Sequence, residues 1–473
     1  MKAKSSLGLL EKIATAVTTW SERWFPDSYI FAVLAIIVVG GGALMMGASF
    51  HSVALSFGDG FWSLIPFTMQ MAIVSISGYV VAASPPAAKL IDWLAQRPRT
   101  GRGAIAYVAF VTIVASLLNW AFSLVFGGLL VKALARRTNL RLDYRAAGAA
   151  AYLGLGATWA LGLSSSAAQL QANPASIPAS LLPITGVIPF TETIFLPQSF
   201  ILLGVITVLS LVVAYLSAPA DDRVKTAQDL GIVLAEPVAD PTRKSQRPGD
   251  WLDESPLASI VIAGLGFVWL INEFQTKEPL LAISNLNTYN FLFLMLGLLL
   301  NWRPRRFLHA VTLSVPSVAG VLIQFPLYGS LAFILTKATG PDGQALGHHI
   351  AQFFVSISSQ NSFPGLMAVY SAVLGFFVPS GGGKWIIEAP YLMQASNDLH
   401  VHLGWTVQIY NAAEALPNLI NPFFMLSLIG VLGLKARDIV GYTFTQFIFH
   451  VPVVIFLLWF LAGTLVYHAP VLP

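Results

Sequence analysis

Long apolar runs recur along the whole chain, and they constrain the possible folds more strongly than any other feature. Two of them, 29–47 and 200–217, are each long enough to cross a hydrocarbon core of about 30 Å. Only 10% of the 473 residues are charged, whereas a typical soluble domain has about 25%. Backbone polar groups inside a bilayer must be satisfied within the protein, which favours helices. The sequence therefore predicts an all-α polytopic membrane protein.

Composition and short motifs exclude several other classes of protein. The net charge of +4 suits anionic lipid headgroups, and the chain offers no basic, aromatic-interleaved face for nucleic acid. Cysteine is absent, which excludes disulfides, thiol catalysis and cysteine-ligated metals. The stretch "GGGKW" resembles the end of a phosphate-binding loop, but Trp385 stands where Ser or Thr is required. Neither HExxH nor GxSxG occurs, so we expect neither an enzyme nor a cofactor.

Lysines and arginines gather in a few segments, which indicates the side of the membrane that each connection faces, because short cytoplasmic loops collect these residues. Basic or mixed-charge clusters occupy 89–102, 132–145, 218–255, 303–306 and 435–437, whereas 48–60, 171–197, 339–362 and 396–403 contain almost no Lys or Arg. The second group is expected outside. Residues 1–28 show no cleavable signal peptide and are expected to form a cytoplasmic N-terminal segment.

Two apolar segments cannot be simple crossings, because both flanks of each lie on the same side. The segment 103–131 has basic connections at both ends, so we expect a re-entrant hairpin that turns near "SLLNWAFS" (116–123). The segment 364–395 has both flanks on the outer side, so we expect a second hairpin that enters from outside. The stretch "VPSGGGKW" (378–385) would then form the tip of this second hairpin.

With both hairpins in place, the two halves of the chain show the same order of elements, which predicts an inverted repeat of five elements each. The first repeat, 29–217, contains 29–47, 62–82, the hairpin 103–131, 146–170 and 198–217. The second repeat, 286–463, contains 286–302, 309–338, the hairpin 364–395, 404–434 and 438–463. The segment 218–255 is expected to be a cytoplasmic linker, and 256–275 a connecting transmembrane helix.

Helix breakers inside apolar segments indicate a site, because non-helical backbone at membrane depth is tolerated only inside protein or beside a watery cavity. The two hairpin tips are matched by interrupted spans at 158–169 and 411–424. Exposed N–H groups at helix N-termini attract a carboxylate, whereas carbonyl, Ser and Asn oxygens coordinate Na⁺. Each small or amide residue taken alone can instead be a helix-packing residue.

The candidate residues divide into two groups. The candidate substrate-binding residues are Gln70, Asn119, Trp120, Gln324, Ser380, Gly381, Gly382, Gly383 and Lys384. The candidate ion-coupling residues are Ser123, Ser164, Ser166, Glu414, Asn418 and Asn421. Histidines 348, 349, 400 and 402 fall in outer connections, and we expect no metal site other than one for Na⁺ as a coupling ion.

Two charged positions carry alternative interpretations. Lys384 and Glu388 are four residues apart on one helix face, so they form either a self-neutralising ion pair or a site at which Lys384 meets an anionic substrate. Glu414 has no Lys or Arg in its own segment, and such an intramembrane carboxylate typically marks a cation or proton site.

Several short motifs resemble, in order and spacing, the short-chain fatty acid transporter family, from about residue 20 to 465. They are "GDGFW" (58–62), "FTMQMA" (67–72), "NW" (119–120), "QFPLY" (324–328), "VPSGGGKW" (378–385), "NLINPF" (418–423) and "RDIVGY" (437–442). The resemblance implies a bacterial plasma-membrane secondary transporter of short monocarboxylates, such as acetoacetate or butyrate. It also implies inverted repeats, a homodimer and an elevator-like motion. Matching the motifs residue by residue assigns roles to Gln70, Asn119, residues 380–383, Glu414 and Asn418.

The sequence therefore leads to a functional hypothesis with alternatives. A small carboxylate binds between the two hairpin tips, and its movement is coupled to H⁺ through Glu414 or to Na⁺ through hairpin carbonyls and Ser or Asn oxygens. The alternative within transport is a cation/proton exchanger on the same architecture. A membrane enzyme or a sensor would need a catalytic dyad or a soluble output domain, and the sequence shows neither.

Overall fold

The computed structural model describes residues 23, 28–174, 176–179, 181–219, 223–234, 247–377 and 381–472. Throughout these residues the regular structure is helical, apart from an isolated bridge between Thr339 and Ala345. Seven helical segments of the described chain are long and apolar enough to cross a membrane: Ile65–Ala82, Gly101–Leu118, Tyr144–Ala172, Pro197–Ser217, Pro256–Thr276, Ala319–Lys337 and Ala436–Ala462. The predicted class, an all-α polytopic membrane protein, is confirmed.

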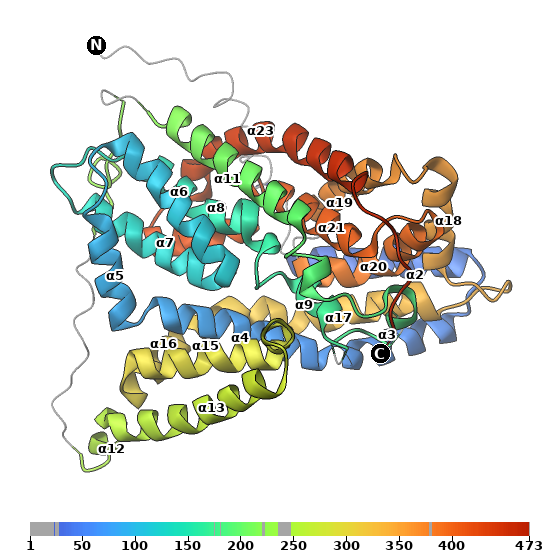
Figure 1. Ribbon diagram of the computed structural model, residues 1–473, viewed down its shortest axis with the longest axis horizontal. Helices are drawn as coiled ribbons and strands as arrows, with labels where there is room; N and C mark the ends of the chain where they lie inside the picture. The colour runs from blue at the N-terminus through green and yellow to red at the C-terminus, as the bar shows by residue number, and fades with distance from the viewer. Residues whose placement is uncertain are drawn as a thin grey trace.

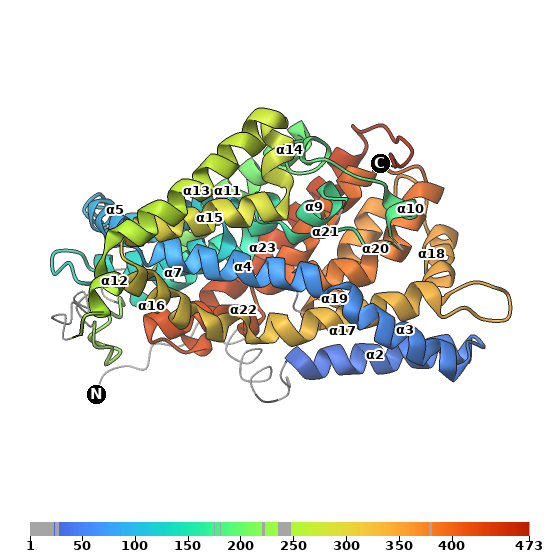
Figure 2. The ribbon, with the colours of Figure 1, turned by 90° about the horizontal axis from the view of Figure 1, so that it is seen from below.

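Most of the longer helices run roughly along the long axis of the molecule, and the basic connections gather at one end of it (Figure 1). At that end Arg137, after α7 (Trp120–Ala135), donates to the carbonyls of Ala95 and Pro98 at 2.8 Å each. Arg303 and Arg305 pair there with Glu254. The opposite end carries α18 (Leu346–Ile357) and the connection that precedes it (Figure 2).

The first helical hairpin consists of α6 (Gly101–Leu118) and α7, which pack against each other. Asn119 separates them in an extended conformation, and its Oδ1 accepts the N–H groups of Ala121 and Phe122 at 2.9 Å each. An Asn at this position ends one helix and caps the next. The turn lies within the segment 116–123, where the charge pattern placed it.

The next span is interrupted, as the sequence predicted. It begins as α8 (Tyr144–Leu153), continues through a π-turn (Gly154–Thr158) and a 3₁₀ turn (Trp159–Leu161), and resumes as α9 (Ser166–Ala172). Gly162 lies in the break, where a Cβ would stand 2.4 Å from the Cα of Leu117 in the first hairpin. Only glycine allows the two backbones to approach this closely.

The second hairpin consists of α19 (Phe363–Phe377) and α20 (Gly381–Asp398). Its tip, 378–380, lies outside the described residues, and so does the predicted site residue Ser380. The hydroxyls of Tyr370 and Tyr391 hydrogen-bond at 2.9 Å between the two legs. The following span is also interrupted, because α21 (Leu403–Asn418) and α22 (Pro422–Leu432) are separated by 419–421.

Three segments differ from expectation. The connections 48–60 and 339–362, which we expect on the outer side, contain helices α3 (Phe50–Ser63) and α18. Ser49 starts α3, because its hydroxyl accepts the N–H of Ser52 at 3.0 Å. The segment expected as one span, 309–338, is divided into α16 (Pro304–Ser314), a 3₁₀ turn and α17 (Ala319–Lys337). Pro304 explains the earlier start, because Pro suits the first turn of a helix.

Corresponding elements of the two halves pack in corresponding ways. The remaining long helices are α2 (Ser28–Met45), α4 (Ile65–Ala82), α11 (Pro197–Ser217), α13 (Pro256–Thr276), α15 (Leu286–Asn301) and α23 (Ala436–Ala462). The contact of α4 with α15 in one half corresponds to the contact of α17 with α2 in the other. Likewise, the contact of α3 with α17 corresponds to the contact of α16 with α4. Helix α11 packs on α6, and α23 packs on α19. This pattern is compatible with the inverted repeat, which itself stays a prediction.

Helix α21 begins at a histidine cap outside the membrane-spanning segments. The Nδ1 atom of His402 accepts the N–H of Trp405 at 3.1 Å, which requires a neutral ring. Burial lowers the pKa of His402 below its ordinary value of 6.5, and the nearby His468 lowers it further, whereas Glu192 opposes the shift. Glu192 also pairs with His468 at 2.8 Å.

We predict that this cap makes the stability of the protein sensitive to acid. As the pH falls through the unfolded value of 6.5, the unfolded chain takes up a proton that the folded chain resists, so stability decreases. A His402→Asn variant keeps a capping side chain that does not titrate. The Tm of the variant, measured in detergent from about pH 8 to about pH 5.5, should rise relative to wild type as the pH falls. A Tm difference independent of pH would contradict this role.

Candidate functional site

The first hairpin tip and the break in the α8–α9 span contact each other through hydrogen bonds. The N–H of Leu163 donates to the carbonyl of Leu117 at 2.7 Å. The N–H of Trp120 donates to the Ser164 hydroxyl at 3.1 Å. Non-helical backbone of the break thus finds partners in the hairpin tip instead of meeting lipid.

The second hairpin approaches the same break through its glycines. A Cβ on Gly381 would lie 2.4 Å from Cη2 of Trp159, and a Cβ on Gly382 would lie 3.1 Å from Cβ of Ser166. The Tyr410 hydroxyl of α21 donates to the carbonyl of Gly381 at 2.5 Å. The break therefore lies between the two hairpins, and the N-terminal end of α20, with its partial positive charge, begins beside it.

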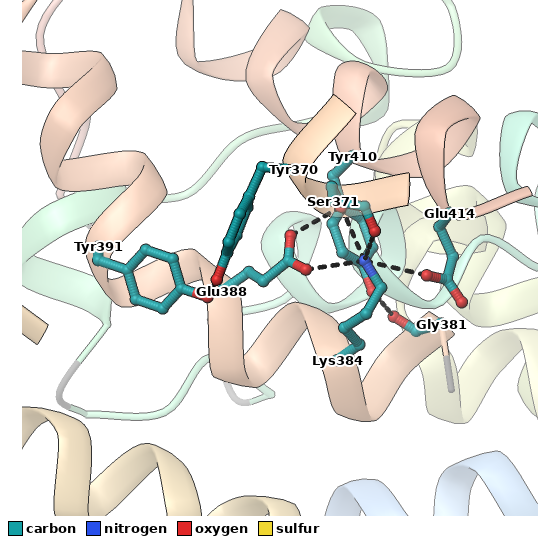
Figure 3. A network of polar contacts seen from close by, with 8 residues as sticks. All are labelled: Tyr370, Ser371, Gly381, Lys384, Glu388, Tyr391, Tyr410 and Glu414. Atoms are coloured by element: carbon teal, nitrogen blue, oxygen red, sulfur yellow. Dashed lines mark hydrogen bonds and ion pairs between the residues drawn. The ribbon is translucent and has the colours of Figure 1, made fainter. Parts of the chain in front are cut away.

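A cluster of charged side chains lies close to Gly381 (Figure 3). The Lys384 ammonium is 2.9 Å from Oε1 of Glu388 and 3.0 Å from Oε2 of Glu414. It also donates to the hydroxyl of Ser371 at 2.7 Å and to its carbonyl at 3.1 Å. All three charged side chains are 0% exposed. Glu414 thus has a cationic partner from α20, which inspection of its own segment did not reveal.

The ammonium of Lys384 has three N–H donors, and the protein occupies all of them. Two reach Ser371 and one reaches Glu388, while the ring of Tyr410 lies 4.2 Å below the nitrogen. In this conformation no donor is left for a substrate carboxylate. Lys384 and Glu388 thus form an ion pair, as their spacing indicated, and substrate contact by Lys384 stays a prediction.

Two polar side chains on one face of α21 lack hydrogen-bond partners among the described residues. Glu414 Oε2 makes an ion pair with Lys384, but neither oxygen of Glu414 has a well-directed hydrogen bond. Asn418, one helical turn further on, has no hydrogen-bond partner for its side-chain amide, although it is fully buried. Buried polar groups are normally paired, so this face is suited to bind a proton, an ion or water.

Further buried polar groups without described partners lie in the break, on α9 and on α20, and sequence reasoning missed them. They are the side-chain amides of Gln169 and Gln171 on α9 and the indole nitrogens of Trp159 and Trp385. The sequence offered a signal for the glutamines, because both fall in a span that is otherwise apolar or small. It offered none for Ser371, whose contact with Lys384 depends on how the two legs of the second hairpin align.

Other predicted site residues form hydrogen bonds with residues that are not part of the charged cluster. Asn119 uses its Oδ1 as the α7 cap and donates from Nδ2 to the carbonyl of Val74 at 3.2 Å. Ser123 donates to the carbonyl of Thr112 at 2.7 Å, and Asn421 donates to that of Phe376 at 3.3 Å. The side-chain amide of Gln70 donates to Oδ1 of Asn287. The Oε1 atom of Gln324 accepts a hydrogen bond from the Tyr328 hydroxyl.

A group of three potential metal ligands lies at the start of α21. Ligand atoms of Glu192, His402 and His468 all lie within 4.8 Å of one another. Because Nδ1 of His402 accepts a backbone hydrogen bond, its neutral ring carries the hydrogen on Nε2 and has no free lone pair there. This tautomer disfavours metal binding by the group.

Comparison with known proteins identifies relatives over nearly the whole chain. The family model described as "Short chain fatty acid transporter" matches residues 9–461. A protein of Escherichia coli strain K12 is 31% identical over 443 residues, covering 93% of this chain and 97% of its own length. A Haemophilus influenzae protein is 31% identical over 461 residues, covering 96% and 100%. Both are assigned to short-chain fatty acid transport by name only.

Two solved structures share the fold at low sequence identity. The YdaH transporter of Alcanivorax borkumensis superimposes with a TM-score of 0.52 at 16% identity and covers 93% of this chain and 98% of its own. MtrF of Neisseria gonorrhoeae, described among antimetabolite efflux pumps, gives a TM-score of 0.53 at 14% identity and covers 98% and 100%. At these identities the comparison shows the fold alone.

We predict that the contact between Gly381 and Trp159 does not tolerate a methyl group. The variant Gly381→Ala should lose about 1–3 kcal/mol of stability, because the buried indole has little room to move. Gly264→Ala, in α13 with nothing within 4 Å of the added Cβ, is the matched control. In detergent, Tm should fall for the first variant only, and Trp159→Phe should restore part of the loss. Equal Tm values for the two alanine variants would refute the close contact.

Proposed function

The chain belongs to the short-chain fatty acid transporter family, and we propose that it is a secondary active transporter that moves a small monocarboxylate together with a proton. One observation carries the coupling: a fully buried cluster of one ammonium and two carboxylates lies next to the glycine-rich start of α20. Family membership supports transport. The geometry of the cluster supports the proposed coupling ion.

The cluster has an excess negative charge when both carboxylates are ionised. Lys384 balances one of the two, and an unbalanced buried charge is strongly disfavoured. A proton on Glu414, whose Oε1 has no described partner, removes the excess. Binding of a substrate anion nearby makes that proton still more favourable. Anion and proton then enter the site together, which is the basis of symport.

We propose that the substrate binds at the junction of α20 and the broken α8–α9 span. Gly381, Gly382 and Gly383 begin α20, and backbone N–H groups at such a position attract carboxylates. Phe67, Phe325 and Trp159 lie close to these glycines and form an apolar wall suited to a short acyl chain. Ser166 lies beside Gly382 and supplies a nearby hydroxyl. Within this proposal, Asn119 and Gln70 hold the surrounding framework.

Sodium is the second candidate coupling ion. Asn418 keeps an unpartnered side-chain oxygen, and Glu414 lies one turn away, so these two residues could contribute to a cation site. Ser164, by contrast, accepts the N–H of Trp120, and Asn119 uses its Oδ1 as a cap. Because few of the predicted Na⁺ ligands are free, we favour the proton.

We also propose an orientation and an assembly. The basic connections at one end of the molecule favour placing that end in the cytoplasm of a bacterium whose inner membrane the chain spans. We assign the N-terminal segment 1–28 to the same side from its sequence. The resemblance to the family supports a homodimer and a relation of the two halves as inverted repeats. No cofactor other than the coupling ion enters this proposal.

Uptake into proteoliposomes tests the proposed function. We predict that an inward proton gradient drives accumulation of labelled butyrate or acetoacetate, above the baseline of protein-free liposomes. Glu414→Gln cannot exchange a proton and should lose most of the gradient-driven uptake. Exposed Glu278→Gln, outside the cluster, is the matched control and should behave as wild type.

Each other outcome has a defined meaning. Uptake driven by a Na⁺ gradient alone would show that the coupling ion is sodium and not the proton. Exchange of Na⁺ for H⁺ without any carboxylate would show that the protein is a cation/proton exchanger. No gradient-dependent uptake of any acid from C2 to C6 would refute the proposed transport. Unchanged proton-driven uptake by Glu414→Gln would remove this residue from the coupling mechanism.

A further inference from the structure

We propose that Lys384 occupies a monovalent-cation site, so that the protein carries its own tethered cation at the position where an inorganic or ammonium ion would otherwise bind. This inference deepens the proposed function, on which it rests only for its consequence for coupling. The site itself is defined by the side chains that surround the ammonium.

The surroundings of the ammonium have the chemistry of a cation site. Four oxygen atoms face the nitrogen: the carbonyl and hydroxyl of Ser371 at 3.1 and 2.7 Å, Oε1 of Glu388 at 2.9 Å and Oε2 of Glu414 at 3.0 Å. The ring of Tyr410 lies 4.2 Å away and adds an aromatic face. Carboxylate, hydroxyl and carbonyl oxygens with an aromatic face are the groups that attract hard cations and ammonium ions.

Most of this site does not depend on the helix that carries the lysine. Ser371 comes from α19, whereas Tyr410 and Glu414 come from α21. The Ser371 hydroxyl also donates to Oε2 of Glu388 on α20 at 2.7 Å, a contact that does not involve the lysine side chain. Removing the lysine side chain beyond Cβ would therefore leave an anionic, oxygen-lined space with the length of a propylammonium ion.

The tethered cation has a consequence for coupling. A site already filled by an ammonium cannot take up Na⁺ during the transport cycle. The second carboxylate is then left to exchange a proton, as the proposed function requires. If Lys384 formed only a structural ion pair, the surrounding oxygens would not need to bind a free cation once the lysine side chain is removed. Cation binding by a variant that lacks the lysine therefore separates the two interpretations.

Chemical rescue of Lys384→Ala tests the inference on purified protein in detergent, without any transport. We expect the variant to lose Tm relative to wild type, and ethylammonium or propylammonium chloride to restore at least half of the loss. Choline chloride at equal ionic strength should restore none, because its quaternary head has no N–H donor and is too large. Wild type and Lys384→Met, whose unbranched apolar chain fills the space, should not respond to the small ammonium ions. Adding Glu414→Gln to Lys384→Ala should weaken the rescue.

A second variant keeps the test decisive if Lys384→Ala does not fold. Lys384→Ala with Glu388→Gln restores the net charge of the wild-type cluster and should show the same selective rescue. Equal Tm responses to choline and to the small ammonium ions would overturn the inference, as would an equal response of Lys384→Met. NaCl and KCl titrations of Lys384→Ala should likewise raise Tm above the choline reference. Because these readouts involve no uptake, a failed uptake assay would refute the proposed function and leave this result standing.

Discussion

A fully buried ammonium between two carboxylates fixes the central part of this molecule. Removing one partner from a buried ion pair costs about 3–5 kcal/mol, because the remaining charge is left without compensation. Lys384 therefore holds α19, α20 and α21 in one arrangement, through Ser371, Glu388 and Glu414. Gly375 permits this arrangement, since a Cβ there would lie 2.8 Å from Oε2 of Glu414. The start of α20, where we place the substrate, is positioned by the same contacts.

A second constraint acts on the backbone. A chain that breaks its helices inside a membrane must pair the freed N–H and C=O groups within the protein. Here the break between α8 and α9 does so with the first hairpin, through Leu163 and Trp120, and it packs against the glycines of the second. The break and the first hairpin tip thus provide hydrogen-bond partners for each other's backbone groups. The substrate site that we propose therefore lies where the freed backbone groups of the two irregular regions are paired.

The sequence allowed the hairpins and interrupted helices to be predicted, because charge at the flanks and breakers inside apolar runs are local signals. Asn119 and Gly162 are visible as breakers without any knowledge of their partners. Helices α3 and α18 were missed, since an amphipathic helix in an outer segment lacks the length and apolarity of a span. The contact between Lys384 and Glu414 was missed for a different reason. It joins residues on separate helices, and no spacing along the chain specifies how α20 faces α21.

The charged cluster also has a consequence in genetic terms. Because Lys384, Glu388 and Glu414 are in contact without access to solvent, a change at any one of them alters the net charge that the other two must accommodate. We therefore expect these three positions to be substituted together in evolution. Relatives that lack the lysine are expected to differ at the carboxylates as well, and intermediates with one change are expected to be rare.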